Sequence, residues 1–181
     1  VRSAGSATRR RGHVAVDLLM PLFAEEASAG KPQFLTKRLA AFAIPGIELA
    51  HLDVASVALR GEALGGGQAS RSVSVCGPGA FVALKALAFA SRGERKDAHD
   101  LIYALECAGV DDVARRMARL APSAHLDRAL ATLRADFSNA DGIGPVRVAQ
   151  FRSSTRPQDL RADAAGRVRG LLQKLDRVAI V

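Results

Sequence analysis

Residues 80–100 contain the side chains whose types and spacing are best suited to chemistry. Lys85 is the only polar side chain between Ala80 and Ala90, a run that is otherwise apolar and has helical character. An ammonium group in so apolar a helix must reach solvent or bind a carboxylate or phosphate, because burying it alone is costly. Arg92 follows seven residues later, two turns along the same helical face.

Two carboxylates follow in the next expected helix. Asp97 lies at the edge of its apolar face and Asp100 slightly further round. If the two helices form a hairpin, Lys85 and both carboxylates meet at one rim. The group could hold a triphosphate, with an acid that orients Lys85 or takes a proton from an attacking hydroxyl. It could instead be a half-buried salt bridge that joins two helices, and residue types alone favour this second interpretation. His99 is expected to be solvated.

The chain divides into a strand-forming part and a helical part. A buried strand is expected over residues 14–20, ending at Pro21, and a hairpin over 56–64 and 70–76 around a glycine-rich turn. Helical patterns follow to the end of the chain, so the fold class is α+β with a small mixed or antiparallel sheet. The expected helices cover residues 80–91, 94–108, 111–120, 123–137 and 157–178, with a connection at 138–147.

This pattern predicts three regions along the chain. Residues 1–13 form a basic, flexible lead-in, residues 14–77 a β-rich core, and residues 78–181 a helical region. Hydrophobic residues make up 49% of the chain and charged residues 24%, which excludes a chain that is disordered throughout.

Charge and composition restrict the partner classes. The net charge of +8 makes nucleotide or nucleic acid a fair partner class, and a solvated basic tail on a mildly basic domain explains the charge about as well. The absence of Trp and the single Tyr disfavour a protein that binds single strands by stacking many bases. No apolar run is long enough to span a membrane, so we expect no membrane partner. Two cysteines without metal-binding spacing favour a reducing cytoplasm.

The spacing of the charged residues resembles a known family. Lys85, Arg92, Lys96, Asp97 and Asp100 follow the pattern K-x6-R-x3-K-D-x2-D. This pattern is similar to the second half of the AbiEii/AbiGii-type nucleotidyltransferases, which are toxins of bacterial toxin–antitoxin and abortive-infection systems. The segment VAVDLL at residues 14–19 also resembles their middle motif, a strand that presents an acidic metal ligand. The likeness covers roughly residues 14–106.

The resemblance implies an activity and a set of partners. It implies a nucleotidyltransferase-like fold that transfers a nucleoside monophosphate from a nucleoside triphosphate to an acceptor, in several relatives the 3′ end of tRNA. Mg²⁺ is the implied cofactor, and a cognate antitoxin is the implied protein partner. The physical logic is that such transfer needs metals held by carboxylates, together with positive charge on the departing phosphate oxygens.

The same resemblance assigns roles to particular residues. Asp17 would be the Mg²⁺ ligand. Lys85 would contact phosphate, and Asp97 or Asp100 would position it or act as a base. The implied nucleotide-binding side chains are Lys85, Arg92 and Lys96.

One departure from the family pattern bears on activity. The family carries a Gly-Ser turn followed on the next strand by an Asp-x-Asp pair that holds the metals. Gly5 and Ser6 are present here, but no Asp or Glu lies between them and Asp17. A single carboxylate cannot assemble a two-metal site.

Two explanations for this departure are open. Either the sequence starts downstream of the true N-terminus, which the first residue Val1 favours, or the chain is a degenerate relative. In both cases we expect the chain as written to be a poor catalyst. The alternatives are a non-catalytic nucleic-acid-binding or regulatory module on the same scaffold, and a purely structural helical protein.

Overall fold

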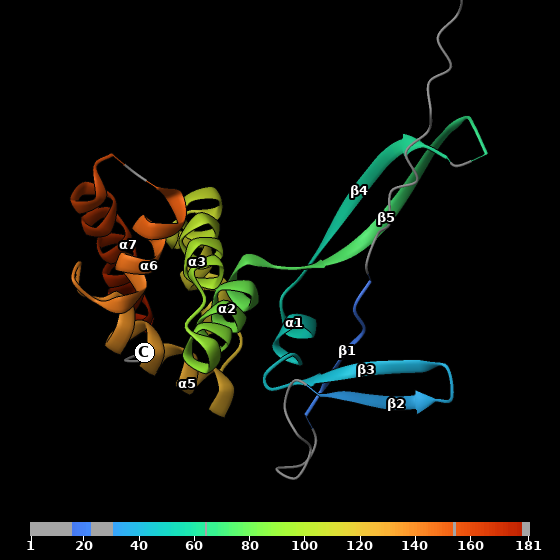
Figure 1. The fold of residues 1–181 in the computed structure, drawn as a ribbon, viewed down its shortest axis with the longest axis horizontal. Coiled ribbons are helices and arrows are strands. Elements are labelled where there is room, and N and C mark those ends of the chain that lie inside the picture. The colour runs from blue at the N-terminus through green and yellow to red at the C-terminus, as the bar shows by residue number, and fades with distance from the viewer. Residues whose placement is uncertain (1–15, 23–30, 64, 154, 179–181) are drawn as a thin grey trace, which may run out of the picture.

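The architecture is α+β, as the sequence pattern predicts. A computed structural model describes residues 16–22, 31–63, 65–153 and 155–178 of the 181-residue chain. Within these residues two small sheets precede a bundle of helices, and the strands extend to one side of that bundle (Figure 1). The basic lead-in and Gly5-Ser6 lie outside the described residues.

The first sheet has three strands in the order β1-β3-β2. β1 runs parallel to β3, and β2 runs antiparallel to it. Ala41 and Ala43 are buried within β3, and Leu49, which follows the strand, is buried in the core of the helical bundle. The bounds are β1 Leu19–Pro21, β2 Pro32–Thr36 and β3 Leu39–Ile44.

The prediction of a buried strand over residues 14–20 is wrong. Residues 14 and 15 lie outside the described residues, and the strand begins only at Leu19. Val16 is 79% exposed and Leu19 is 51% exposed. Among the described strands β1 pairs only with β3, so it is an edge strand of this sheet, and an edge position tolerates Pro21 inside the strand.

The predicted hairpin is confirmed. β4 (Val54–Glu62) and β5 (Gln68–Cys76) pair antiparallel over their full length. Because side chains alternate along a strand, one face of this hairpin is mainly apolar and the other is rich in serine. The described residues leave the apolar face open, since Val57 is 38% exposed and Leu59 is 55% exposed. The apolar face includes Val57, Leu59, Val73 and Val75, and the other face includes Ser56, Ser70, Ser72 and Ser74.

The helical part agrees with expectation except at one helix. The prediction of a connection over residues 138–147 is wrong in its second half, because α6 begins at Ile143. Gly144 and Pro145 suggest a break, but a Cβ at residue 144 would collide with the ring of Phe137, so glycine permits close packing there. Pro145 lies in the first turn, where no backbone donor is needed. The helices are α1 Leu49–Leu52, α2 Pro78–Arg92, α3 Arg95–Ala108, α4 Val110–Ala118, α5 Ala124–Thr132, the π-helical turn η1 Leu133–Phe137, α6 Ile143–Arg152 and α7 Pro157–Val178.

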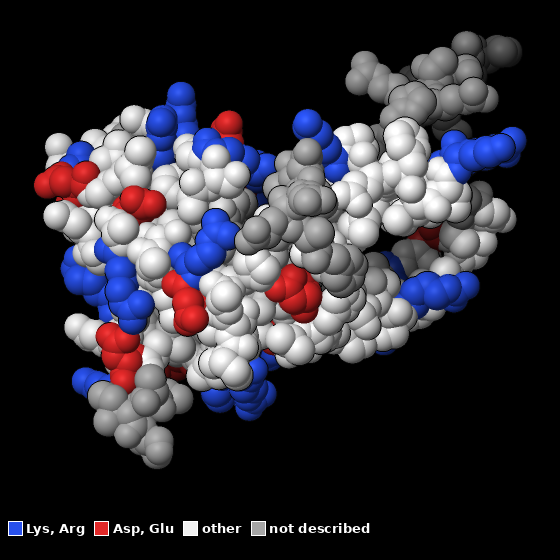
Figure 2. Space-filling view, turned by 90° about the horizontal axis from the view of Figure 1, so that it is seen from below, with Lys and Arg blue, Asp and Glu red and all other residues white. Residues whose placement is uncertain are grey.

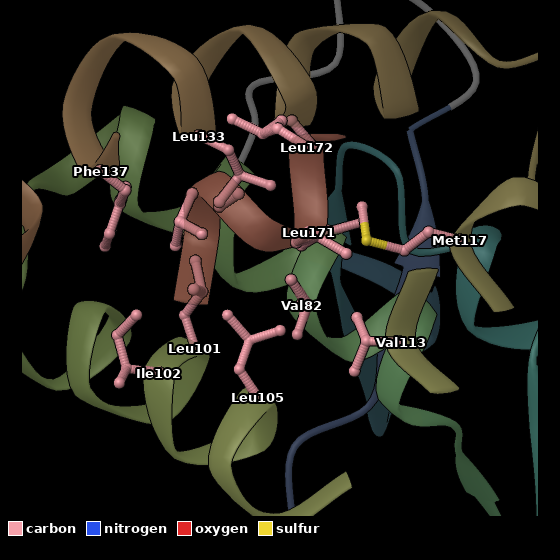
Figure 3. Close-up of a cluster of buried hydrophobic side chains, with 14 of the residues drawn as sticks. Val82, Leu101, Ile102, Leu105, Val113, Met117, Leu133, Phe137, Leu171 and Leu172 are labelled. Carbon is pink, nitrogen blue, oxygen red and sulfur yellow. The ribbon is translucent and has the colours of Figure 1, made fainter. Parts of the chain in front are cut away.

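The hydrophobic core lies among α2 to α7. Phe89 of α2 and Phe137 of η1 meet edge to face, with ring centroids 4.9 Å apart. Around them the apolar faces of the helices interdigitate, and α3 and α7 contribute leucines to the centre (Figure 3). Fully buried side chains include Val82, Leu101, Ile102, Leu105, Val113, Met117, Leu133 and Leu171.

Asp53 connects the base of the β4–β5 hairpin to the bundle. It immediately precedes β4 and is 6% exposed. Its Oδ2 accepts the backbone N–H of Ala80 at 3.0 Å, in the first turn of α2, and its Oδ1 accepts from Arg116 of α4 at 2.8 Å. A Cβ at Gly77 would collide with this carboxylate. Asp53 therefore caps α2 from outside the helix, where a negative charge is also favoured by the helix dipole.

We predict that Asp53→Ala lowers the free energy of unfolding by about 2 kcal/mol, because it removes a buried cap and charge partner. Asp53→Asn should cost less, since its amide oxygen still accepts the Ala80 N–H. Urea unfolding followed by circular dichroism measures both. Asp163→Ala, which removes an exposed partner of Arg167, is the control and should cost under about 0.5 kcal/mol. Equal losses in Asp53→Ala and the control would contradict the prediction.

Candidate functional site

The turn between α2 and α3 places the candidate residues together. Gly93 has φ 64°, a left-handed conformation that glycine adopts without strain, and its N–H bonds to the Phe89 carbonyl. Glu94 is extended, and α3 starts immediately afterwards. The two helices therefore pack as a hairpin, which brings the middle of α2 beside the first turns of α3.

Lys85 lies between the two carboxylates, as the spacing predicts. Its Nζ donates to Asp97 Oδ1 at 3.0 Å and to Asp100 Oδ2 at 2.7 Å. The Asp97 side chain is 1% exposed and that of Lys85 is 19% exposed. The Lys85 amine also lies 5.5 Å from the centre of the Phe81 ring. The amine is thus held at the rim of the bundle, with little freedom to move.

Two further cations complete the group. Arg92 binds Asp97 with two hydrogen bonds, from Nε at 2.6 Å and from Nη2 at 2.9 Å. Lys96 Nζ donates to Asp100 Oδ2 at 2.6 Å. The side chains of Arg92 and Lys96 are 59% and 68% exposed, so the solvent side of the group is cationic. We name Lys85, Arg92, Lys96, Asp97 and Asp100 the ion cluster.

The charged side chains of the ion cluster shift one another's pKa values. Burial raises the pKa of Asp97, but hydrogen bonds and charge from Arg92 and Lys85 outweigh it and lower that pKa below its ordinary value. The pKa of Asp100 is lowered in the same way, with Lys85 and Lys96 outweighing burial. Burial opposes the charged form of Lys85, yet hydrogen bonds to both carboxylates raise its pKa.

These pKa shifts bear on the two roles that the resemblance implies for the carboxylates, which are to position Lys85 or to act as a base. A general base works best with a pKa near the operating pH, and the lowered pKa values of Asp97 and Asp100 move them away from it. A permanently ionised carboxylate is well suited to orienting an ammonium group. In the structure both carboxylates accept hydrogen bonds from the Lys85 amine and so fix its position, and their roles in catalysis stay a prediction. The Lys85 amine has three donors, of which the two carboxylates use two.

The structure does not bring Asp17 to the ion cluster. Asp17 is exposed and precedes β1, and no hydrogen bond or ion pair between the two is present in the described part of the chain. Within residues 16–22, 31–63, 65–153 and 155–178, no group of three or more His, Cys, Asp or Glu side chains could hold a metal ion. The described residues thus do not fit a two-metal Mg²⁺ site, and the metal role of Asp17 stays a prediction.

Sequence reasoning missed a cluster next to the ion cluster. His99 is half-buried rather than solvated, and its ring stacks on that of Phe151 with centroids 4.5 Å apart. Its Nδ1 lies 3.1 Å from Arg152 Nε, and Arg152 forms a two-pronged salt bridge with Glu106. Tyr103 lies one turn from His99 on α3, which a helical spacing could have indicated. Phe151 and Arg152 belong to α6, the helix that was not expected.

Basic side chains are also found away from the ion cluster. Figure 2 shows Lys and Arg on both the helical body and the strands, several of them next to acidic side chains. An open depression of about 420 Å³ lies between α4 and α7, and none of its lining residues belongs to the ion cluster. It is lined by Asp111, Ala114, Arg115, Ala118, Lys174 and Arg177. No helix in the described residues is long and apolar enough to cross a membrane.

Comparisons of the chain with protein-family models, with curated proteins and with solved structures find no match. The assignment to a nucleotidyltransferase family therefore stays a prediction that rests on the spacing of the ion cluster.

We predict that Asp97 controls part of the acid sensitivity of the fold. Because its folded-state pKa is below the ordinary 3.8, its stabilisation is complete above that value and is lost as the pH falls through the folded pKa. Asp97→Asn should be less stable than the unmodified chain at pH 7, and the difference should shrink below about pH 4.

Urea unfolding between about pH 2.5 and pH 7 measures this dependence. Asp163→Asn, at an exposed carboxylate, is the control and should give a profile parallel to that of the unmodified chain. If the unfolding free energy of Asp97→Asn also follows pH in parallel with that of the unmodified chain, the ion cluster does not contribute to acid sensitivity.

Proposed function

We propose that the chain is a nucleotidyltransferase-like protein that binds the phosphates of a nucleoside triphosphate at the ion cluster. The observation that carries the proposal is the position of Lys85, which two ionised carboxylates hold at the rim of α2 and α3. Arg92 and Lys96 present cationic groups to solvent on either side of it. The resemblance in spacing adds the chemical class of the ligand.

Each cation retains donors for a phosphate oxygen. Lys85 keeps one N–H beyond the two that bind Asp97 and Asp100. Arg92 uses Nε and Nη2 on Asp97, so Nη1 is available for charge-assisted hydrogen bonds. Lys96 is flexible and largely exposed, and it can exchange Asp100 for phosphate at small cost. A triphosphate would thus add a third anion to a group with three cations and two carboxylates.

The proposal also includes a transfer reaction, which goes beyond phosphate binding. Transfer of a nucleoside monophosphate to an acceptor such as the 3′ end of tRNA is the activity that the resemblance implies, with a cognate antitoxin as protein partner. The described residues do not supply the carboxylates of a two-metal site, so we derive no metal-dependent step from them. What the residues support is phosphate binding and the orientation of Lys85 by Asp97 and Asp100.

A second candidate function has an observation in its favour. All three cations already donate to Asp97 or Asp100, so the ion cluster satisfies itself without a ligand. The cluster would then join two helices in a non-catalytic nucleic-acid-binding or regulatory module, or in a purely structural protein. Binding of inorganic phosphate chains separates the purely structural function from the first, because an ion pair that only joins two helices does not bind them. Transfer of a labelled nucleotide to RNA separates the non-catalytic nucleic-acid-binding module from the first, because that module binds RNA and gives no transfer product.

We predict that inorganic tripolyphosphate binds the chain and that Arg92→Gln combined with Lys96→Gln weakens binding about tenfold. In this double variant Lys85 still pairs with the buried Asp97, and urea unfolding of the variant checks that it remains folded. Isothermal titration calorimetry at low salt measures the dissociation constant.

The matched control removes two cations elsewhere. Lys37 and Arg38 are exposed between β2 and β3, and Lys37→Gln with Arg38→Gln changes the net charge equally. This control should change binding less than about twofold, through long-range charge alone. Equal weakening in both variants, or no binding by the unmodified chain, would contradict phosphate binding at the ion cluster and favour the structural function.

A further inference from the structure

An exposed aromatic group lies beside the ion cluster. The Tyr103 side chain is 56% exposed and that of Phe151 is 44% exposed, and both lie against His99. The His99 and Phe151 rings stack with an angle of 17° between their planes, and the Tyr103 ring lies 5.9 Å from His99. We name these three rings the aromatic platform. The whole chain has only one Tyr and no Trp, and that Tyr lies in this group.

The platform is held in place before any ligand arrives. Arg152 Nε donates to His99 Nδ1, which leaves the ring proton of neutral His99 on Nε2. Arg152 is in turn fixed by two hydrogen bonds to Glu106, at 2.9 Å and 2.8 Å. Burial and the charge of Arg152 lower the pKa of His99, which keeps the ring neutral. Rings that are already ordered lose little conformational entropy when a ligand stacks on them.

The platform and the ion cluster lie along one helix. Lys96, Asp100 and Tyr103 are spaced four and three residues apart, so they follow one face of α3. With a rise of 1.5 Å per residue, Lys96 and Tyr103 are separated by about 10 Å along the helix axis. A ligand that spans both groups has an anionic end and a planar end. A nucleotide combines these two features in one molecule.

We propose that the aromatic platform is the stacking surface for the nucleobase of the nucleotide whose phosphates bind the ion cluster. This inference rests on the proposed function, and it adds the part of the site that selects nucleotides over inorganic phosphates. Stacking on rings tolerates every base, because each base has an aromatic face. The platform therefore confers affinity for all four nucleoside triphosphates and little preference among them.

The test compares ATP with inorganic tripolyphosphate by calorimetry. The unmodified chain should bind ATP about tenfold more tightly than tripolyphosphate, because only ATP reaches the platform. Tyr103→Leu with Phe151→Leu should abolish that preference and leave tripolyphosphate binding unchanged. Tyr103→Phe keeps the ring and should keep the preference. Phe34→Leu, at a residue on β2 that is 77% exposed, is the matched control and should change the binding of neither ligand.

The outcomes separate the two proposals. If the leucine double variant still prefers ATP, or if the unmodified chain binds both ligands equally, the platform is not the base site while phosphate binding at the ion cluster stands. If neither ligand binds the unmodified chain, both proposals fail. Thermal unfolding of the leucine double variant should match that of the unmodified chain, since both substituted rings lie at the surface.

Discussion

The pairing of Asp97 with Lys85 and Arg92 is the interaction on which the candidate site depends. Asp97 is almost fully buried, and a buried carboxylate persists only when its charge is matched by hydrogen-bonded cations. Its two oxygens accept from α2 at two points, which fixes the angle at which α3 leaves the turn. The same bonds hold the Lys85 amine at the rim. A structural ion pair and a phosphate site thus need the same geometry, and they differ only in whether the exposed cations recruit an anion.

A second buried carboxylate, Asp53, has a similar role at the other end of α2. It joins the start of β4 to the first turn of α2 and to Arg116 of α4. Among the described residues, none buries the apolar face of the β4–β5 hairpin. The strand ladder joins its two strands, and the Asp53 bonds connect its base to the bundle. Charge therefore ties the first turn of α2 to β4 and α4, and it ties the middle and the end of α2 to α3 through Lys85 and Arg92.

The parts of the structure that sequence could predict are those set by local pattern. The ion pairs of Lys85 with Asp97 and Asp100 could be predicted, because a short turn joins the helix of Lys85 to the helix of both carboxylates. Residues that act over long separations were not predictable. Asp53 contacts Arg116, 63 positions away, and nothing near either residue indicates its partner. The aromatic platform was missed because Phe151 lies on a helix whose start resembles a turn.

We expect the Lys85 amine to bind phosphate although it is paired with two carboxylates. Its ammonium signal can be followed by NMR at low pH and low temperature while inorganic tripolyphosphate is added to isotope-labelled protein. Phosphate binding should give a saturable shift of the Lys85 signal at concentrations that leave the exposed Lys37 signal in place. A Lys85 signal that does not move, or one that moves only together with Lys37, would contradict phosphate binding and leave the ion cluster as a connection between two helices.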